Sequence, residues 1–247
     1  MSKKISKFRF KQFAVSHHRS SMKVGVDGVL IGCWSDTEGA KRILDVGTGC
    51  GLISLIIAQR NSEAIIDAID IDESSIYEAL ENFEASPWKN RLRVELCSYS
   101  NASNLIKDSD LGYDLIVSNP PYFDSGMTET VTAREKARHQ GELSPLALLK
   151  GADEILNYDG IVAMVIPSEI SDSLEKEAEN IGYFLQRKCL VRGHIDAPYK
   201  RALLQFEKRA EGKTEKHPDM EFLTLEISPG VPTEDYRNLC KDFYLKF

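Results

Sequence analysis

The stretch Arg42-Ile43-Leu44-Asp45-Val46-Gly47-Thr48-Gly49-Cys50-Gly51 runs directly into a second apolar segment, Leu52 to Ala58. An apolar run that ends in a glycine-rich turn and then resumes predicts a strand, a tight turn and the start of a helix. Glycine at alternate positions lets the backbone approach a ligand closely. The turn differs from the dinucleotide fingerprint G-x-G-x-x-G, because Leu52 stands where that motif has its last glycine. This difference disfavours a nicotinamide-dependent oxidoreductase.

A further acidic residue follows at the distance expected for a nucleoside site. The apolar run Ala64 to Ile69 predicts a strand that ends at Asp70. An acid about 20 residues after a glycine-rich turn commonly binds ribose hydroxyls. Asp72 begins the next helix, and we expect it to be the N-terminal cap of that helix instead. Alternating glycines after Asp45 suit an adenosyl amino acid, because such a ligand has no pyrophosphate to cradle.

A third motif, Asn119-Pro120-Pro121-Tyr122, directly follows the apolar run Asp114 to Ser118. The side-chain oxygen of Asn119 and the carbonyl oxygen of Pro120 can each accept one N–H of a planar amino group. The two prolines fix φ and have no N–H that would compete for these acceptors, and Tyr122 offers a face for stacking. A rigid exit from a buried strand is the alternative. The tetrapeptide therefore predicts that an amino nitrogen, of adenine or of a carboxamide, is held for methylation.

The glycine-rich turn, Asp70 and the tetrapeptide form an ordered set along the chain. In this order they resemble the class I S-adenosylmethionine-dependent methyltransferases that act on amino nitrogens. The resemblance implies S-adenosylmethionine as the cofactor and an α/β, Rossmann-like fold.

The rest of the chain alternates between expected strands and helices, which favours a mostly parallel sheet with helices on both faces. Expected strands cover 43–46, 64–69, 92–97, 113–118, 160–166, 184–191 and 202–207, with one more at 221–227. Expected helices cover 50–60, 73–84, 145–156, 172–180 and 233–240. We expect a seven-stranded class I sheet in which 184–191 and 202–207 form a terminal antiparallel pair.

The ligand crevice should lie at the carboxyl ends of the strands, where Gly47, Asp70 and Asn119 all fall. One domain is expected over residues 1–247. Residues 1–40 would form an N-terminal extension that covers the cofactor site, and residues 41–247 the catalytic core.

Composition agrees with a cytoplasmic enzyme but discriminates little between functions. The 247 residues are 42% hydrophobic, enough for one sizeable core. No stretch of about 18 apolar residues and no signal peptide are present, so we expect no membrane segment. His17-His18 is too isolated from other ligand types to predict a metal site. The scattered cysteines, without a C-x-x-C pair, indicate reduced thiols. They are Cys33, Cys50, Cys97, Cys189 and Cys240.

The net charge of −7 argues mildly against a nucleic-acid partner, because phosphate binding needs Lys and Arg. Positive charge is nevertheless gathered in three clusters. They are Lys3, Lys4, Lys7, Arg9 and Lys11; Arg134, Lys136, Arg138 and His139; and Arg187, Lys188, Arg192, His194, Lys200 and Arg201. Each cluster alone suits an ordinary surface, whereas three around one site would form a phosphate-binding rim.

Segments outside the shared motifs carry a narrower resemblance. They are Phe10 to Phe13, Met22 to Trp34, Asp235 to Leu239 and Asp242 to Leu245, beside Asp114 to Tyr122. Over nearly the whole chain they resemble the bacterial N6-adenine methyltransferases of tRNA1(Val), which modify adenine(37) beside the anticodon. The N-terminal motif is the specific part, since the other motifs are shared with many amino-methylating relatives. The resemblance implies tRNA as the partner, and we expect a monomer.

The resemblance also implies roles for individual residues. Cofactor contacts are implied for Lys23, Asp27, Asp45, Gly47, Gly49, Gly51, Asp70, Ser98 and Asn119, with Gly25 and Gly28 in the same pre-strand segment as Lys23. The catalytic residues would be Asn119, Pro120, Pro121 and Tyr122. Two positions depart from the family: Val26 replaces a usual Thr, and Ser98 lies where many relatives carry an Asp beside the adenine. For Lys23 and Asp27 a surface salt link is the alternative.

The expected reaction is an in-line displacement in which the cofactor supplies the activated methyl group and the protein aligns it with the nitrogen. A protein glutamine N5-methyltransferase could use the same tetrapeptide, although such relatives usually carry a helical domain before the core. Another N6-adenine methyltransferase, of DNA or rRNA, stays open, but a DNA enzyme normally needs a recognition domain larger than the loop at 123–143. A catalytically silent cofactor- or RNA-binding module is disfavoured by the intact tetrapeptide.

Overall fold

The computed structural model describes residues 7–20, 22–106, 112–121, 143–208 and 217–247. The strands are β1 (Phe8–Arg9), β2 (Ala14–Val15), β3 (Arg42–Val46), β4 (Ile65–Asp70), β5 (Leu92–Leu96), β6 (Tyr113–Ser118), β7 (Leu156–Pro167), β8 (Tyr183–His194), β9 (Arg201–Lys208), β10 (Asp219–Ser228) and β11 (Val231–Pro232). The helices are α1 (Val26–Trp34), α2 (Leu52–Arg60), α3 (Glu73–Glu84), α5 (Pro145–Ala152), α6 (Ser171–Asn180) and α7 (Glu234–Cys240). Short 3₁₀ helices are η1 (Lys89–Arg91), η2 (Tyr99–Ile106) and η3 (Ser168–Ile170).

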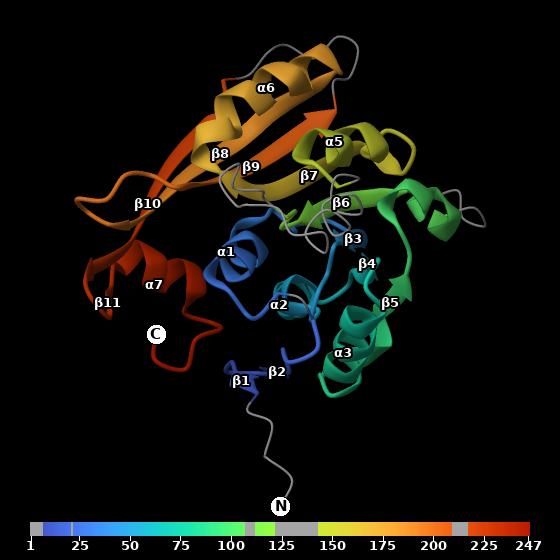
Figure 1. The fold of residues 1–247 in the computed structure, drawn as a ribbon, viewed down its shortest axis with the longest axis horizontal. Coiled ribbons are helices and arrows are strands. Elements are labelled where there is room, and N and C mark those ends of the chain that lie inside the picture. Colours follow the sequence, from blue (N-terminus) through green and yellow to red (C-terminus); the bar gives the residue numbers. More distant parts are fainter. Residues whose placement is uncertain (1–6, 21, 107–111, 122–142, 209–216) are drawn as a thin grey trace, which may run out of the picture.

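The main sheet has nine strands in the order β11-β10-β8-β9-β7-β6-β3-β4-β5 (Figure 1). Neighbours from β5 to β7 pair in parallel, whereas β9 runs antiparallel to both β7 and β8. The predicted class I sheet with its antiparallel pair is confirmed. Strand β10 corresponds to the further strand expected at 221–227, and β11 extends the sheet beyond it. Because β8 points the same way as β7, the carboxyl ends of β3, β4, β6, β7 and β8 share one edge, here called the carboxyl edge.

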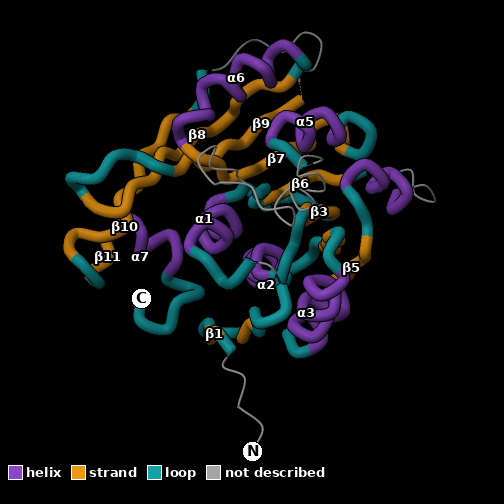
Figure 2. The backbone as a smooth tube through the Cα atoms, viewed as in Figure 1, coloured by secondary structure: helices purple, strands orange, loops and turns teal. Residues whose placement is uncertain are grey.

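Helices cover both faces of the sheet (Figures 1 and 2). On one face α1, α2, α3 and α7 enclose an apolar cluster that includes Leu30, Ile56 and Phe83. On the other face α5 and α6 enclose a second cluster that includes Leu148 and Leu174. Each fully buried Leu or Ile contributes about 1.5–3 kcal/mol relative to exposure. These two clusters hold the loops at the carboxyl edge in place.

Helix α1 lies where the sequence predicts only a segment that folds over the cofactor site. Every residue of α1 from Gly28 onward is buried, so the helix lacks the amphipathic pattern that reveals a surface helix. A Cβ on Gly32 would lie 3.0 Å from Cγ2 of Ile56, and one on Gly28 would lie 3.1 Å from Cδ2 of Leu52. The two glycines therefore allow α1 to pack closely against α2, the helix that follows the glycine-rich turn.

The expected helix at 145–156 is too long. Helix α5 ends at Ala152 and Leu156 already begins β7. The sequence Leu-Leu-Lys-Gly-Ala-Asp-Glu-Ile-Leu is apolar at helical spacing across this junction, so periodicity alone did not reveal the break.

Asp72 caps α3 as predicted, since its side chain accepts a hydrogen bond from the N–H of Ser75.

Candidate cofactor and amino-group site

The glycine-rich turn connects β3 to α2 at the carboxyl edge. Positive φ angles occur at Gly47 (71°), Gly49 (55°) and Gly51 (80°), a region that residues with a Cβ rarely adopt. The N–H groups of Gly47 and Thr48 donate to the carbonyl oxygen of Ile69, at 2.9 and 3.0 Å. These bonds fix the turn to the neighbouring strand β4, so its backbone is held rigidly at the predicted cofactor position.

Asp45 is fully buried beneath this turn. Its Oδ2 accepts hydrogen bonds from the hydroxyls of Thr48 (2.7 Å) and Ser54 (2.6 Å). Its Oδ1 is buried and has no hydrogen-bond partner within the described part of the chain. Burial raises the pKa of Asp45 to about 6, although the bonds from Ser54 and Thr48 act in the opposite direction. Asp45 thus ties the turn to α2, and the direct cofactor contact implied for it stays a prediction.

Asp70 ends β4 beside the turn. One carboxylate oxygen accepts the N–H of Gly49 (2.9 Å), and the other accepts the N–H of Asp72 (3.0 Å). Burial raises the pKa of Asp70, and the backbone bonds from Asp72 and Gly49 partly oppose the rise. A carboxylate has about four acceptor positions, so two backbone donors leave capacity for ribose hydroxyls. The ribose contact of Asp70 stays a prediction.

Two exposed apolar side chains flank Asp70 and were missed from the sequence. Ile71 is 47% exposed and Leu96 is 57% exposed, and Leu96 pairs with Asp70 across β4 and β5. Each offers an apolar surface close to Asp70, of the kind on which a planar base can pack. The signal available in the sequence was their position at the ends of two expected neighbouring strands.

Ser98 follows at the same edge. The N–H of Cys97 donates to the carbonyl oxygen of Asp70 (3.0 Å), which places Ser98 close to the end of β4. Its hydroxyl lies 2.9 Å from the hydroxyl of Ser100. A contact between Ser98 and the cofactor adenine therefore stays a prediction.

The tetrapeptide begins where β6 ends, directly beside β3. Ser118 pairs with Val46 across the two strands, and its hydroxyl donates to the carbonyl oxygen of Val46 (2.8 Å). Asn119, the next residue, therefore lies level with the start of the glycine-rich turn. Pro120 is buried, while Asn119 and Pro121 are partly exposed. Tyr122 lies outside the described residues.

Glu78 on α3, absent from the predicted site, holds the N-terminal extension. Its side chain is 2% exposed, and its carboxylate accepts the backbone N–H groups of His18 (2.6 Å), Arg19 (3.1 Å) and Ser20 (2.8 Å). These bonds lower the pKa of Glu78 despite the opposing effect of burial. The backbone N–H groups of this short segment therefore bond to the carboxylate of Glu78 rather than to the backbone of a helix or strand.

Asn82 continues this contact one helical turn further along α3. Its side-chain amide accepts the N–H of Ser16 (2.8 Å) and donates to the carbonyl oxygens of Ser16 (2.9 Å) and Cys50 (2.8 Å). Cys50 belongs to the glycine-rich turn, so Asn82 joins the extension to that turn. Glu78 and Asn82 lie four positions apart on the buried face of the predicted 73–84 helix, and polar residues on a buried face were the overlooked signal.

The carboxylate of Asp27 pairs with the guanidinium of Arg201 at 2.8 Å. The cofactor contacts implied for Lys23 and Asp27 stay predictions. Lys23 is exposed, as is Val26. The Asp27–Arg201 pair joins the start of α1 to the start of β9 at the carboxyl edge.

Two cations of the third basic cluster are paired within the chain. Arg187 pairs with Glu221 at 2.8 Å, and Lys188, whose side chain is 6% exposed, pairs with Asp172 at 2.8 Å. These partners account for both charges within the structure. Lys3, Lys4 and the cluster at 134–139 lie outside the described residues. The side chain of Lys11 donates to the carbonyl oxygens of Lys241 and Phe247.

The described ranges contain neither a membrane-spanning helix nor a cluster of metal ligands. Within them, no helix has the length and apolar character needed to cross a membrane. No three potential ligands from His, Cys, Asp and Glu gather into a cluster there that could hold a metal ion. The five cysteines are free thiols.

Comparison with known proteins places this geometry in a family. The Methyltransferase small domain family matches residues 28–181. A tRNA1(Val) (adenine(37)-N6)-methyltransferase of Trichodesmium erythraeum is 41% identical over 98% of this chain and 99% of its own length. The enzyme of the same description from Parabacteroides distasonis is 44% identical over 97% of this chain and 98% of its own length.

Solved structures agree on the fold. A predicted O-methyltransferase of Agrobacterium tumefaciens superposes with a TM-score of 0.65 at 16% identity, over 88% of this chain and 96% of its own. A class I S-adenosylmethionine-dependent methyltransferase of Listeria monocytogenes gives a TM-score of 0.54 at 14% identity, over 83% of this chain and 65% of its own. The fold is thus the class I methyltransferase fold, and by full-length sequence identity the chain belongs to the tRNA1(Val) (adenine(37)-N6)-methyltransferase family.

Proposed function

We propose that this chain transfers a methyl group from S-adenosylmethionine to N6 of adenine(37) in tRNA1(Val). The observation that carries the proposal is the pairing of β3 with β6. It sets Asn119 and Pro120 level with the glycine-rich turn, so an amino group and a cofactor can be held on neighbouring strands.

The residues at the turn fit an adenosyl amino acid. The turn presents glycine backbone at its surface, and a Cβ on Gly49 would meet nothing within 4 Å. Asp70 would hold the ribose hydroxyls, and Ile71 and Leu96 would pack on the adenine ring. The buried, unpartnered Oδ1 of Asp45 adds negative charge beneath the turn, which suits a cationic ligand. When bound, S-adenosylmethionine supplies a methyl group activated by its sulfonium centre.

The tetrapeptide accounts for activation of the target nitrogen. An exocyclic amino group is a weak nucleophile because its lone pair is delocalised into the ring. The side-chain oxygen of Asn119 and the carbonyl oxygen of Pro120 would accept its two N–H bonds, which orients the lone pair toward the methyl group. Both acceptors also stabilise the positive charge that develops on nitrogen as the N–C bond forms. The proton then leaves to water, and no general base is needed before attack.

The choice of tRNA rests on the relatives. The Trichodesmium and Parabacteroides relatives are tRNA1(Val) (adenine(37)-N6)-methyltransferases and align with this chain over nearly its full length. The chemistry agrees, because an unpaired loop base is turned out of its stack at lower cost than a paired one. We further propose one catalytic domain that works as a monomer in the cytoplasm, where its tRNA substrate resides; sedimentation velocity of the purified chain, with and without tRNA, tests the monomer.

Label distribution tests the proposed activity. The purified protein is incubated with methyl-labelled S-adenosylmethionine and, in separate reactions, total tRNA, genomic DNA and a protein extract. We expect label in 6-methyladenosine from tRNA1(Val), mapped to position 37 by nuclease digestion and mass spectrometry. Label in glutamine of a protein, or in adenine of DNA or rRNA with none in tRNA, would contradict the proposal.

A further inference from the structure

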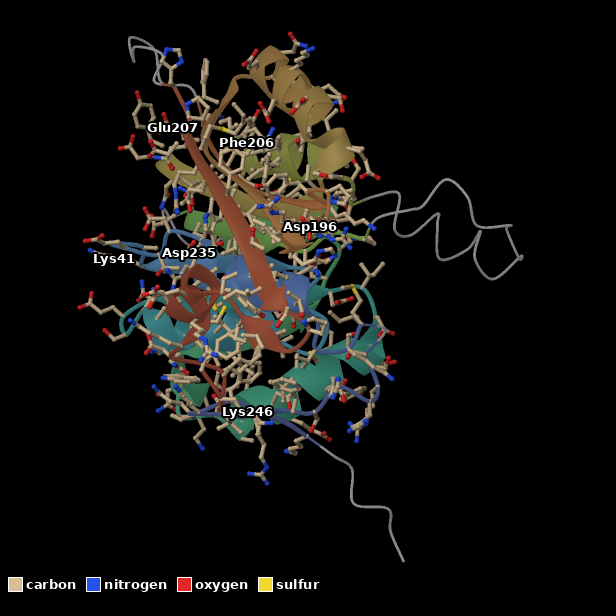
Figure 3. The ribbon with its side chains drawn as sticks, turned by 90° about the vertical axis from the view of Figure 1, so that its left-hand side faces the viewer. Lys41, Asp196, Phe206, Glu207, Asp235 and Lys246 are labelled. Atoms are coloured by element: carbon tan, nitrogen blue, oxygen red, sulfur yellow. The ribbon has the colours of Figure 1, made fainter. Side chains whose placement is uncertain are left out.

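The hairpin between β8 and β9 extends past the carboxyl edge. In the strand order it lies across β7 and β6 from β3, the strand that leads into the glycine-rich turn. Arg201, at the start of β9, pairs with Pro167 of β7, while Ser118 at the end of β6 pairs with Met164. The hairpin residues 192–200 therefore lie beyond the level of Asn119 along the strand direction. In Figure 3 Asp196 of this hairpin and Lys41 lie on opposite sides of the molecule.

The hairpin is held in a fixed position. Ser168 of η3 donates its N–H to the carbonyl oxygen of Lys200 (3.2 Å) and its hydroxyl to the carbonyl oxygen of Tyr199 (2.7 Å). The ion pair between Arg201 and Asp27 holds the base of the hairpin to α1. Side chains on the hairpin are thus placed by the core rather than by the hairpin alone.

The structure divides the third basic cluster into two groups. Arg187, Lys188 and Arg201 have carboxylate partners within the chain, as described above. Arg192, His194 and Lys200 lie at the carboxyl edge, where His194 and Lys200 are exposed. The group at the edge can reach an external phosphate, whereas the first group stabilises the fold.

An aromatic stack accompanies the group at the edge. The guanidinium of Arg192 lies 5.0 Å from the ring centroid of Tyr199, and Nε of Arg192 donates to the hydroxyl of Thr224 at 2.8 Å. The ring of Tyr199 lies 5.6 Å from that of Phe222 on β10. Phe222 is 60% exposed, and α6 packs over the neighbouring strand β8. Arg192, Tyr199 and Phe222 thus follow one another in a row of stacked side chains on this surface.

Cationic and planar side chains in alternation are the features that bind unpaired nucleotides. Aromatic rings and the plane of Arg stack with bases, and the cations meet the phosphates. The positive charge of Arg192 and Lys200 is complementary to RNA, although the chain as a whole is acidic. Asp196 and Glu226 lie nearby, and their negative charge would restrict phosphate binding to the part of the patch that carries the cations. The strand order places β8 and β10 three and four strands from β6, which is about 14–19 Å at the usual strand spacing.

We infer that Arg192, Tyr199, Lys200 and Phe222 form a docking platform for unpaired nucleotides of the tRNA that flank the target adenine. The inference rests on the proposed function. A separation of about 14–19 Å is spanned by only a few nucleotides of an unpaired strand. The platform therefore binds a flank of the anticodon arm while Asn119 and Pro120 hold the target base.

Substitution of the two rings tests the platform. The variant Tyr199→Ala/Phe222→Ala is titrated with an in-vitro transcript of tRNA1(Val), and its KM and kcat are measured. Since stacking of a base is worth ~1–3 kcal/mol, we expect the Kd and KM for tRNA to rise by about tenfold or more. The kcat at saturating tRNA and the calorimetric affinity for S-adenosylmethionine should stay at wild-type values. Lys200→Ala should weaken binding less and reduce the salt dependence by about one phosphate contact.

Matched controls come from the opposite edge of the sheet. Tyr158, 69% exposed near the amino end of β7, is replaced by Ala, as is the exposed Lys41. Both control variants should bind tRNA like the wild type. Unchanged tRNA affinity in the double variant, or an equal loss in the Tyr158→Ala control, would overturn the platform while wild-type methylation of tRNA continued. Failure of the wild type itself to label tRNA would instead overturn the proposed function, and the platform with it.

Discussion

At the scale of single residues, Asp45 and Asp70 were both expected at the ends of strands, but the structure gives them different environments. Asp45 lies beneath the glycine-rich turn with one oxygen unpartnered, whereas both oxygens of Asp70 accept backbone N–H groups at the edge. The sequence placed both at strand ends, but it could not show that Asp45 faces inward. Which face a strand-terminal side chain takes depends on the helix packed above it, here α2 through Ser54.

The raised pKa of Asp45 predicts how cofactor binding varies with pH. Its pKa is about 6 in the folded protein and ordinarily 3.8, so the folded state retains a proton that the unfolded state releases. The contribution of Asp45 to stability therefore falls as pH rises from 3.8 toward 6 and is constant above. A cationic ligand favours the ionised carboxylate. We expect S-adenosylmethionine to bind up to about tenfold more weakly at pH 5 than at pH 7.5, measured by calorimetry.

S-adenosylhomocysteine is the matched ligand, because it lacks the sulfonium charge. Its affinity should vary less over the same pH range, and Asp45→Asn should flatten the profile for S-adenosylmethionine. Identical profiles for the two ligands would show that the buried carboxyl does not sense the cation.

Asp70→Ala should weaken binding of S-adenosylmethionine by about 1.5–3 kcal/mol, the value of hydrogen bonds to a charged group. Asp70→Asn, which keeps an acceptor for the N–H of Gly49, separates loss of the ribose contact from loss of turn geometry. Calorimetric titration gives the affinities, and thermal melting checks that each variant is folded. An unchanged titration for the alanine variant would mean that the ribose acid is elsewhere.

At the scale of elements, the sequence predicted the strands and helices of the core well and the extension poorly. Helix α3 and strand β6 have the predicted bounds, because alternating or helical apolar spacing is strong there. Helix α1 was missed, since it is buried on all sides and two glycines lie at its contact with α2. The extension is held by Glu78 and Asn82 through backbone groups, and contacts to backbone leave no pattern in the sequence of the segment they hold.

The contact through Glu78 gives a prediction with an internal control. Glu78→Gln removes the charge that accepts three successive N–H groups, and at ~1.5–3 kcal/mol per charged hydrogen bond we expect a loss of roughly 3 kcal/mol in the free energy of unfolding. The affinity for S-adenosylmethionine should fall with it, because Asn82 joins the same segment to the turn. Glu84→Gln, at the exposed end of α3 where its ion-pair partner is Lys89, should change neither. Urea unfolding and calorimetry measure the two effects.

The lowered pKa of Glu78 determines how the loss of stability in Glu78→Gln varies with pH. Its stabilisation is present above its ordinary pKa of 4.5 and is lost as pH falls through the lower folded value. The difference in stability between the wild type and Glu78→Gln should therefore shrink toward pH 3. A difference that is constant with pH would show that the carboxylate charge is not what holds the extension.

At the scale of the whole molecule, the site is assembled from segments far apart in the chain. The turn after β3, the end of β4 and the tetrapeptide after β6 meet at one edge because the strands are parallel, which the order of motifs was sufficient to predict. The hairpin at 192–200 reaches the same edge only because β9 reverses the direction between β7 and β8. The sequence indicated the basic cluster there. It could not show which cations are paired internally and which are exposed, because the partners come from other elements, α1, α6 and β10.

In the proposed mechanism Asn119 holds the amino group of the target beside the cofactor turn. The most direct test of this role is the single-turnover rate of methyl transfer to tRNA1(Val) by Asn119→Ala, with the affinity for S-adenosylmethionine measured on the same preparation and Asn90→Ala as an exposed control. We expect the rate to fall by about 100-fold or more, as for loss of one group that stabilises a developing charge. The cofactor affinity should change by less than about 1 kcal/mol. A rate near that of the wild type, with the variant folded and the cofactor bound, would contradict the claim.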